Sequence, residues 1–299
     1  MRELRIGGDT YRLVKGCRAV PEIRESFEAL TRKIYGFDFE SWYQHGYWKQ
    51  QYLPYLLMKE SEVVANVSVN PMKFTMMGEP KRCVQIGTVM THPLYRRRGL
   101  SRVLMEEALW DWEAECDWMF LFANDSVLDF YPKFGVHPVE EYQWYGEIRQ
   151  QASEGQIQRM DFRNERHRRL LYGLVEKAKP YAKLNMEKNA ELILFYALNF
   201  LSENFYYLPA ISAVAVVDYA ADKLLLQGIF CEGEVPLKKL AAMLAKPETK
   251  EVCLEFTPRD TAGFQVRPLH EEDCTLFMRP AQRALFRREK LRFPVLSHT

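Results

Sequence analysis

Apolar runs and short polar turns alternate along the first half of the chain, and their period changes at one point. Residues 55–59 and 63–69 are apolar runs separated by Glu60-Ser61-Glu62, which predicts a β-hairpin. Residues 71–77 and 83–90 predict two further strands, the second rich in β-branched side chains. After Gly99 the apolar residues recur at helical spacing, so a helix follows the last of these strands.

Elements on either side of this meander give the first half a definite order. Residues 20–43 predict helices before it. Residues 118–123 form a short apolar run that predicts a buried strand, residues 127–131 predict a short helix, and residues 142–148 predict a closing strand. The predicted order is therefore helices, antiparallel meander, loop and helix, strand, short helix and final strand.

The second half repeats the strand pattern of the first. A polar, glycine-containing connection over residues 150–156 separates the two halves. Beyond it we expect a helix carrying Leu170, Leu171, Leu174 and Val175, and a second helix over residues 188–201. The remaining predicted elements are strands 213–217 and 223–231, helix 236–245, strand 251–256, and a closing hairpin of 263–267 and 274–279.

A basic, turn-forming loop joins strand 83–90 to the helix after it. The loop reads His92-Pro93-Leu94-Tyr95-Arg96-Arg97-Arg98-Gly99-Leu100-Ser101-Arg102. The first N–H groups of a helix have no internal partner and carry partial positive charge, so an anion fits there. Gly99 allows the backbone to approach such an anion closely. The plain alternative is a solvated basic turn, which is what a charge run alone usually means.

Two motifs resemble those of GNAT-type N-acetyltransferases. Arg96 and Gly99 match the first two places of the pattern Arg/Gln-x-x-Gly-x-Gly/Ala, with Ser101 as a departure in the third. Tyr131-Pro132-Lys133-Phe134-Gly135-Val136 is similar to the family's Tyr-x-x-x-Gly-Phe signature, with Val136 in place of the aromatic residue. The order of elements also resembles that family.

Within this family the Arg-Arg-Arg-Gly-Leu-x-Arg form looks most like the Eis-type acetyltransferases, which acetylate amines. The resemblance implies an α/β (α+β) fold of two tandem GNAT-like lobes, each a mixed, mostly antiparallel sheet flanked by helices. The second lobe is degenerate in that group, and a third domain follows; we expect two lobes here without that third domain. We expect a catalytic domain at residues 1–149, a degenerate domain at 150–280 and a tail at 281–299.

The same resemblance implies acetyl-CoA as co-substrate. Tyr131 would act as the general acid that protonates the CoA thiolate; without the family pattern, a packing role would be favoured. The residues implied for cofactor binding lie on the strand edge, in the basic loop and at the end of the next strand: Val89, Met90, Thr91, Arg96, Arg97, Arg98, Gly99, Leu100, Ser101, Arg102 and Asn124. Arg97, Arg98, Gly99 and Ser101 would hold the diphosphate, and Arg96 or Arg102 a more distant phosphate.

The general base stays open. His92 is a residue type that titrates near neutrality, although a capping role fits its position equally well. A water chain to Glu28, Asp38 or Glu40 is an alternative. In Eis-type enzymes the C-terminal carboxylate serves as base, but Thr299 ends a different tail, so we do not transfer that role.

An aromatic-rich stretch over residues 35–52 also carries Asp38 and Glu40, which suits a cationic amine acceptor. An ordinary core beneath two helices is the equal alternative. A polyamine, an aminoglycoside-like compound or a lysine side chain would each fit. The corresponding loop of the second half, residues 231–236, carries Glu232 and Glu234 and no basic residue, so we expect no CoA site there.

Composition excludes few classes. The formal net charge of +1 gives no global attraction to nucleic acid or membrane, and no apolar run approaches a membrane span. The polar N-terminus and six scattered cysteines indicate a cytoplasmic protein with free thiols and no metal site. Two rival functions remain: an acyl-CoA sensor without transferase activity, and nucleic-acid binding through the arginines of residues 163–169 and 287–292, which ranks lower. A homo-oligomer is left open.

Overall fold

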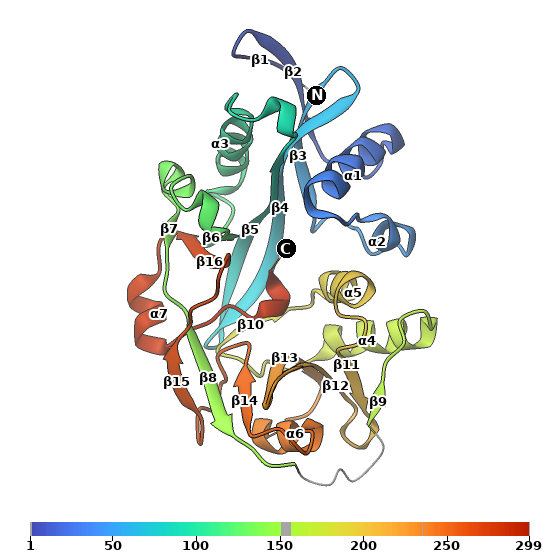
Figure 1. The fold of residues 1–299 in the computed structure, drawn as a ribbon, viewed down its shortest axis with the longest axis vertical. Coiled ribbons are helices and arrows are strands. Elements are labelled where there is room, and N and C mark those ends of the chain that lie inside the picture. Colours follow the sequence, from blue (N-terminus) through green and yellow to red (C-terminus); the bar gives the residue numbers. More distant parts are fainter. Residues whose placement is uncertain (1, 151–156, 235, 299) are drawn as a thin grey trace.

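The computed structural model describes residues 2–150, 157–234 and 236–298. Two lobes, each built around a β-sheet, lie one above the other along the long axis of the molecule (Figure 1). The sheets are mixed, mostly antiparallel and flanked by helices. The predicted fold class is therefore confirmed.

The first sheet has nine strands in the order β1-β2-β3-β4-β5-β6-β16-β7, with β10 paired to β4 outside this path. Only β5 and β6 form a parallel pair among them. The bounds are β1 Arg2–Ile6, β2 Asp9–Lys15, β3 Leu53–Lys59, β4 Glu62–Met76, β5 Glu79–Thr91, β6 Trp118–Ala123, β7 His137–Pro138, β10 Leu184–Glu187 and β16 Thr275–Arg279.

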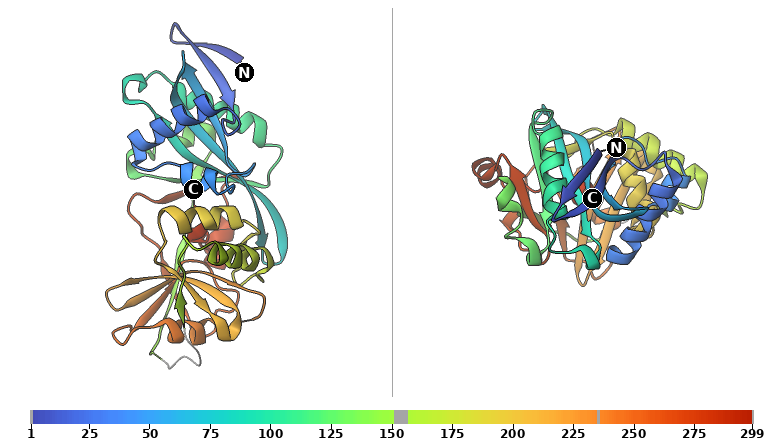
Figure 2. Two further views of the ribbon diagram at one scale, coloured as in Figure 1. Left: turned by 90° about the vertical axis from the view of Figure 1, so that its right-hand side faces the viewer. Right: turned by 90° about the horizontal axis from the view of Figure 1, so that it is seen from above.

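Helices cover both faces of the first sheet (Figures 1 and 2). α1 (Pro21–Tyr35) and α2 (Glu40–Gln44) lie on one face, where Phe27 packs into a core shared with Phe74 and Phe120. α3 (Leu100–Trp112) lies on the other, where Leu104 and Met105 pack against the strands. Each helix buries one apolar stripe, as an amphipathic sequence does.

The second sheet has the order β15-β8-β14-β13-β12-β11-β9, in which β13 and β14 run parallel. α4 (Glu165–Lys177) and α5 (Ala190–Asn199) lie on the face toward the first lobe, and α6 (Leu237–Leu244) covers the other face (Figure 1). The strand bounds are β8 Tyr142–Glu147, β9 Gln158–Arg159, β11 Phe205–Leu208, β12 Ala213–Ala220, β13 Lys223–Cys231, β14 Glu251–Leu254 and β15 Gln265–Pro268.

The two lobes exchange their closing strands. β8, predicted to close the first sheet, pairs with β14 and β15 in the second. β16, predicted to form a hairpin with β15, instead pairs with β6 and β7 in the first sheet. Both pairings were predicted wrongly. The alternation of apolar and polar residues along a strand identifies its buried face but not the strand that pairs with its edge. The sheets consequently do not follow a division of the chain at residue 149.

Local predictions differ from the structure in three further places. Residues 71–77 are not a separate strand but the end of the long β4, whose last residues pair with β10 of the second half. Residues 127–131 are not one helix, since two 3₁₀ turns, Asp125–Val127 and Tyr131–Phe134, stand there. The β1–β2 hairpin was not predicted. Of the predicted connection 150–156, all but residue 150 lies outside the described residues.

The C-terminal segment is a buried bridge between the lobes. After α7 (Arg283–Glu289), Phe293 stacks on Phe120 of the first lobe with ring centroids 4.2 Å apart. Three residues later, Leu296 packs into the core around α4 and α5. Directly before Phe293, the side chain of Arg292 is 1% exposed and lies 2.5 Å from Glu255 and 2.6 Å from Glu271.

We expect Arg292→Met to lower the free energy of unfolding by about 3 kcal/mol, because it leaves Glu255 buried without its counter-charge. Urea denaturation at neutral pH measures this loss. Arg169→Met is the matched control: Arg169 forms an exposed pair with Glu165, worth about 0.5 kcal/mol or less. Equal stability losses in the two variants would contradict the bridging role of Arg292.

Candidate active site

A deep cleft opens where β5 and β6 separate. Their parallel pairing covers only Cys83–Trp118, Val84–Met119 and Gln85–Phe120, after which β5 continues without β6 beside it. The cleft has a volume of about 900 Å³. Its wall is built from the end of α1, the last residues of β5, the basic loop, and the end of β6 with the turns after it: Ile34, Tyr35, Phe37, residues 86–91, Arg96, Arg97, Ser101, Phe122, Asn124, Ser126, Val127, Phe130 and Tyr131.

A β-bulge shapes the wall of this cleft. Ser68 of β4 pairs with Gly87 and Asn66 pairs with Met90, so β5 has one extra residue between the two pairs. Thr88 within this bulge has a φ of +49°. A β-branched residue is strained in that region and persists only where the surroundings hold it. Two hydrogen bonds do so: the Asn66 amide donates to the Thr88 carbonyl (2.7 Å), and the Tyr52 hydroxyl donates to the Thr88 hydroxyl (2.8 Å).

The structure brings part of the predicted basic loop to the cleft and turns part of it away. Arg96, Arg97 and Ser101 lie on the cleft wall. Gly99, with a φ of +78°, directly precedes α3, so the free N–H groups of the first turn begin beside them. Arg98 is held by Asp9 at 3.1 Å, and three Arg side chains in sequence cannot share one direction.

Two other loop residues are also off the wall. Leu100 is fully buried in the core beneath α3. Arg102 points outward and pairs with Glu106 at 2.9 Å, one helical turn along. The side chains of Arg98, Leu100 and Arg102 are therefore not placed to contact a ligand in the cleft. The backbone N–H groups at the start of α3 remain available to such a ligand.

The strand edge predicted for the pantetheine arm does line the cleft. Val89, Met90 and Thr91 are all on its wall. The Val89 carbonyl accepts a hydrogen bond from the Tyr35 hydroxyl at 2.8 Å, and Thr91 Oγ1 lies 2.6 Å from Ser101 Oγ. A ligand that used the Val89 carbonyl would therefore first displace Tyr35.

Tyr131 lies on the opposite wall, at the start of the second 3₁₀ turn. Its ring packs against Phe277 with centroids 5.8 Å apart, and among the described residues none is hydrogen-bonded to its hydroxyl. Burial raises the pKa of this phenol well above its usual value, so it stays protonated at neutral pH. Asn124, at the end of β6, is exposed on the same wall.

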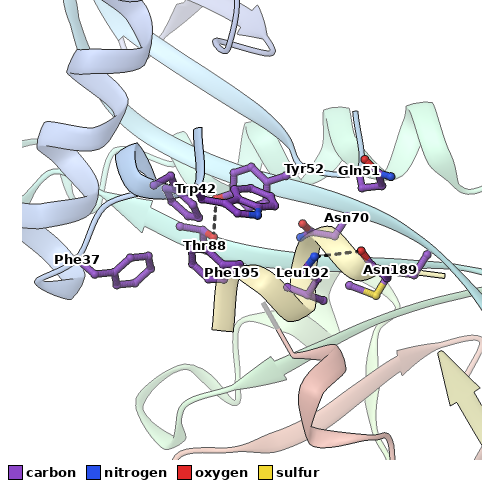
Figure 3. A pocket seen from close by; sticks show the side chains of 11 residues that line it. Phe37, Trp42, Gln51, Tyr52, Asn70, Thr88, Asn189, Leu192 and Phe195 are labelled. Carbon is purple, nitrogen blue, oxygen red and sulfur yellow. Dashed lines mark hydrogen bonds between the residues drawn. The ribbon is translucent and has the colours of Figure 1, made fainter. Parts of the chain in front are cut away.

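A small aromatic pocket of about 40 Å³ adjoins the cleft (Figure 3). The two share Thr88 and Phe37 as lining residues. The first lobe contributes most of the rings, and α5 of the second lobe closes the other side. The remaining lining residues are Phe39, Trp42, Gln51, Tyr52, Asn70, Met72, Asn189, Leu192 and Phe195.

The predicted carboxylates do not line this pocket. Glu28 on α1 is 3% exposed and lies with Asp38 and Glu40 beside Arg24 and Arg32, outside both cavity walls. Burial, followed by the charges of Glu40 and Asp38, raises the pKa of Glu28 to about 7. Aromatic residues of the predicted amine site thus lie at the cleft, whereas its carboxylates form a separate cluster.

His92 has the capping role. It precedes the 3₁₀ turn Pro93–Tyr95, where its Nδ1 accepts from the Leu94 N–H at 3.3 Å and its Nε2 lies 2.7 Å from Lys33 Nζ. Partial burial and Lys33 lower the pKa of His92. It is absent from the described walls of both cavities.

The C-terminal tail is a neighbour that sequence reasoning missed. The ring of His298 stacks on Phe122 of the cleft wall with centroids 3.5 Å apart, and its carbonyl accepts from the Tyr196 hydroxyl. Burial lowers the pKa of His298 to about 3, so the ring is neutral. No local pattern predicts this approach, because it depends on the bridging path of the tail. Thr299, to which we transferred no role, lies outside the described residues.

A model of the acetyltransferase (GNAT) domain family matches residues 23–139, which include the meander, the basic loop and Tyr131. This stretch of the chain is therefore similar in sequence to a GNAT acetyltransferase domain. A search of curated proteins gave no match.

Solved structures show that the GNAT-like fold extends over both lobes. A conserved protein of unknown function from Enterococcus faecalis has a TM-score of 0.58 at 14% identity, over 90% of this chain and 72% of the other. The GCN5-related N-acetyltransferase from Kribbella flavida has 0.55 at 14%, over 90% and 71%. Eis1 from Mycobacterium abscessus has 0.54 at 14%, over 89% and 72%. The resemblance to tandem-lobed, Eis-type proteins is thereby confirmed at the level of fold.

The second GNAT-like lobe offers no equivalent loop among its described residues. Between β13 and α6 stand Glu232 and Glu234, and their carboxylates would repel a diphosphate. The described residues also hold no cluster of His, Cys, Asp and Glu suited to a metal ion, and none of the six cysteines is paired. Within the described chain, no helix combines the length and apolar character that a membrane span needs.

We expect Glu28→Gln to change the pH dependence of stability. The folded pKa of about 7 lies above the ordinary value of 4.5, so the stability contributed by the neutral carboxyl is lost as pH rises from about 4.5 to about 7. Between about pH 5 and pH 8, the free energy of unfolding of the variant should therefore rise relative to that of the wild type by on the order of 2 kcal/mol. Urea titrations at both pH values measure this, with the exposed Glu25→Gln as control on the same helix. A parallel pH response of all three proteins would contradict it.

Proposed function

We propose that this protein is an acetyl-CoA-dependent N-acetyltransferase that moves the acetyl group to a primary amine of a small molecule or a lysine side chain. One observation carries the proposal: a single cleft runs from Arg96, Arg97 and the start of α3 to Tyr131, and it meets the aromatic pocket at Thr88. Solved GNAT proteins from Escherichia coli and Brucella melitensis were crystallised with CoA and acetyl-CoA respectively, which agrees with the proposed ligand.

Cofactor binding follows from the charges along the cleft. The diphosphate would lie at the N–H groups that begin α3, where Arg96, Arg97 and Ser101 stand on the wall. The pantetheine arm would run along residues 87–91 of β5 and displace the Tyr35 hydroxyl from the Val89 carbonyl. The thioester would then lie at the inner end of the cleft.

In the reaction, the nitrogen of a neutral amine attacks the thioester carbonyl carbon, and the C–S bond breaks as the tetrahedral intermediate collapses. The departing thiolate takes the proton of the Tyr131 hydroxyl. The excess proton of the amine passes to solvent, and the phenolate takes a proton back from solvent, which restores the phenol. The raised pKa of Tyr131 keeps the phenol protonated at neutral pH, so a proton is present on this wall when the C–S bond breaks.

The aromatic pocket bears on the class of acceptor. Its lining is mostly aromatic and apolar, which suits the methylene chain of an amine better than sugar rings covered with hydroxyl groups. Aromatic faces also attract an ammonium group before it loses its proton. We therefore favour a lysine side chain or a polyamine over an aminoglycoside-like acceptor.

A second candidate, an acyl-CoA sensor without transferase activity, is favoured by one observation. No Asp, Glu or His stands among the described residues that line the cleft or the aromatic pocket, so no side chain there can deprotonate an ammonium ion. Calorimetric titration with acetyl-CoA, combined with a thiol-release assay over an amine panel, separates the two. Binding without release of CoA under any amine supports the sensor.

Four of the arginines that suggested nucleic-acid binding have acidic partners nearby or are buried. Arg163 pairs with Asp161, Arg169 with Glu165, and Arg287 with Glu140. Arg292, the last of the arginines considered, is buried. This arrangement weakens the case for nucleic-acid binding through these side chains.

We expect Arg97→Gln to weaken acetyl-CoA binding by about tenfold to a hundredfold, because a charge-assisted bond to phosphate contributes roughly 1.5–3 kcal/mol. Calorimetric titration measures the dissociation constant. Arg98→Gln removes the same charge from the next position, where Asp9 holds the side chain, and should weaken binding by less than about threefold. The reverse order of effects would show that the loop rearranges around the ligand.

We expect Tyr131→Phe to lower turnover by about a hundredfold while the affinity for acetyl-CoA stays nearly intact, because only proton donation to the thiolate is lost. Steady-state thiol release and calorimetric titration give the two quantities. Tyr145→Phe is the control, because Tyr145 is a partly exposed residue of the second lobe whose hydroxyl bonds to Gln265. Unchanged turnover in Tyr131→Phe would remove this phenol from the mechanism.

A further inference from the structure

Four polar side chains form a hydrogen-bonded chain behind the bulge of β5. Asn66 Nδ2 donates to Ser68 Oγ at 2.9 Å, and Ser68 Oγ lies 2.9 Å from the Tyr52 hydroxyl. The Tyr52 hydroxyl in turn lies 2.8 Å from Thr88 Oγ1, the contact drawn in Figure 3. Asn66, Ser68 and Tyr52 are buried, whereas Thr88 is partly exposed on the cavity wall.

The direction of this chain is fixed from its buried end. The Thr88 carbonyl can only accept, so the nitrogen of the Asn66 amide must face it, and the second hydrogen of that nitrogen goes to Ser68. Ser68 is fully buried and cannot donate back to an amide nitrogen, so its own hydrogen goes to Tyr52. Tyr52 must then donate to Thr88 Oγ1.

One hydrogen is left over, that of the Thr88 hydroxyl. Its oxygen already accepts from Tyr52, and Thr88 lines both the cleft and the aromatic pocket. The bulge and the positive φ of Thr88 place the residue at this junction, and the Asn66 bond to its carbonyl holds the strained backbone there. The Thr88 hydroxyl thus has a hydrogen to donate at the residue where the two cavities meet.

We propose that the Thr88 hydroxyl donates a hydrogen bond to the carbonyl oxygen of the bound acetyl thioester, with Tyr52, Ser68 and Asn66 as positioning residues. The assignment rests on the proposed function, because that function puts the thioester at the inner end of the cleft. As the amine attacks, this oxygen becomes negative, and a donor already in place stabilises it. No proton is transferred in this role: Thr88 keeps its hydrogen throughout.

The chain behind Thr88 makes it a better donor than an isolated hydroxyl. Each group that accepts one hydrogen bond donates its own hydrogen more strongly in a low-dielectric interior. Burial raises the pKa of Tyr52 far above its ordinary value, so Tyr52 stays protonated and the direction of the chain does not reverse with pH. Neither Thr88 nor Tyr52 would be found by motif, since they are far apart in sequence.

The direct test is the carbonyl stretch of [1-¹³C]acetyl-CoA bound to the protein, measured by isotope-edited difference infrared spectroscopy. A hydrogen bond to the carbonyl lowers this frequency. We expect a lowered stretch in the wild type and in Thr88→Ser, and a higher one in Thr88→Val, which keeps the branched shape and therefore the same backbone strain. Thr31→Val, which removes a buried hydroxyl bonded to the Phe27 carbonyl, should match the wild type.

Kinetics supply the second readout. Thr88→Val should lower kcat for amine-dependent thiol release by about tenfold to a hundredfold, with the KM for acetyl-CoA changed less than about threefold. Thr88→Ser should recover most of kcat. Tyr52→Phe leaves Thr88 in place and removes the hydrogen bond that orients it. This variant should lower kcat in part and raise the carbonyl stretching frequency in part, and it tests the proposal even if Thr88→Val does not fold.

Different results overturn different statements. A carbonyl stretch that is the same in the wild type, Thr88→Val and Tyr52→Phe overturns the role of Thr88 and leaves the acetyltransferase proposal standing. Failure of the wild type to bind acetyl-CoA overturns both. Binding with a lowered stretch but no thiol release supports the hydrogen bond and points to the sensor.

Discussion

The short pairing between β5 and β6 is the constraint on which the site depends. Three residue pairs hold the parallel strands together, and beyond Gln85 β5 carries the bulge at Thr88 and no longer pairs with β6. Strand edges left unpaired in this way expose backbone groups that a ligand can use. The cleft, the position of the basic loop at its mouth and the placement of Tyr131 across from β5 all follow from that separation.

Exchange of the closing strands makes the two lobes one structural unit. β16 completes the first sheet beside β6, and β8 completes the second beside β14, so neither sheet is built from one continuous stretch of chain. The C-terminal segment reinforces this link, because its apolar residues enter both cores and the buried Arg292 lies between two carboxylates. As a result, α5 of the second lobe is held firmly enough to form a wall of the aromatic pocket.

The described walls of the site carry hydrogen-bond donors and no carboxylate or imidazole that could act as a base. Phenols and a threonine hydroxyl face the cavities, while the carboxylates that the sequence offered are paired with arginines elsewhere. Such a site can polarise a carbonyl and protonate a leaving group. On the proposed function, deprotonation of the amine is left to solvent.

The sequence by itself determined the local elements and the anion loop. The helices, most strands and the basic loop at the start of α3 were predictable, because periodicity and loop chemistry act over a few neighbouring residues. Only the tertiary structure decided which sheet β8 and β16 join, that Arg98 turns to Asp9 while Arg97 faces the cleft, and that Tyr52 orients Thr88. The physical reason is that a pattern of apolar residues shows which face of an element is buried, whereas the partner on that face is selected by packing and hydrogen bonding across long distances in sequence.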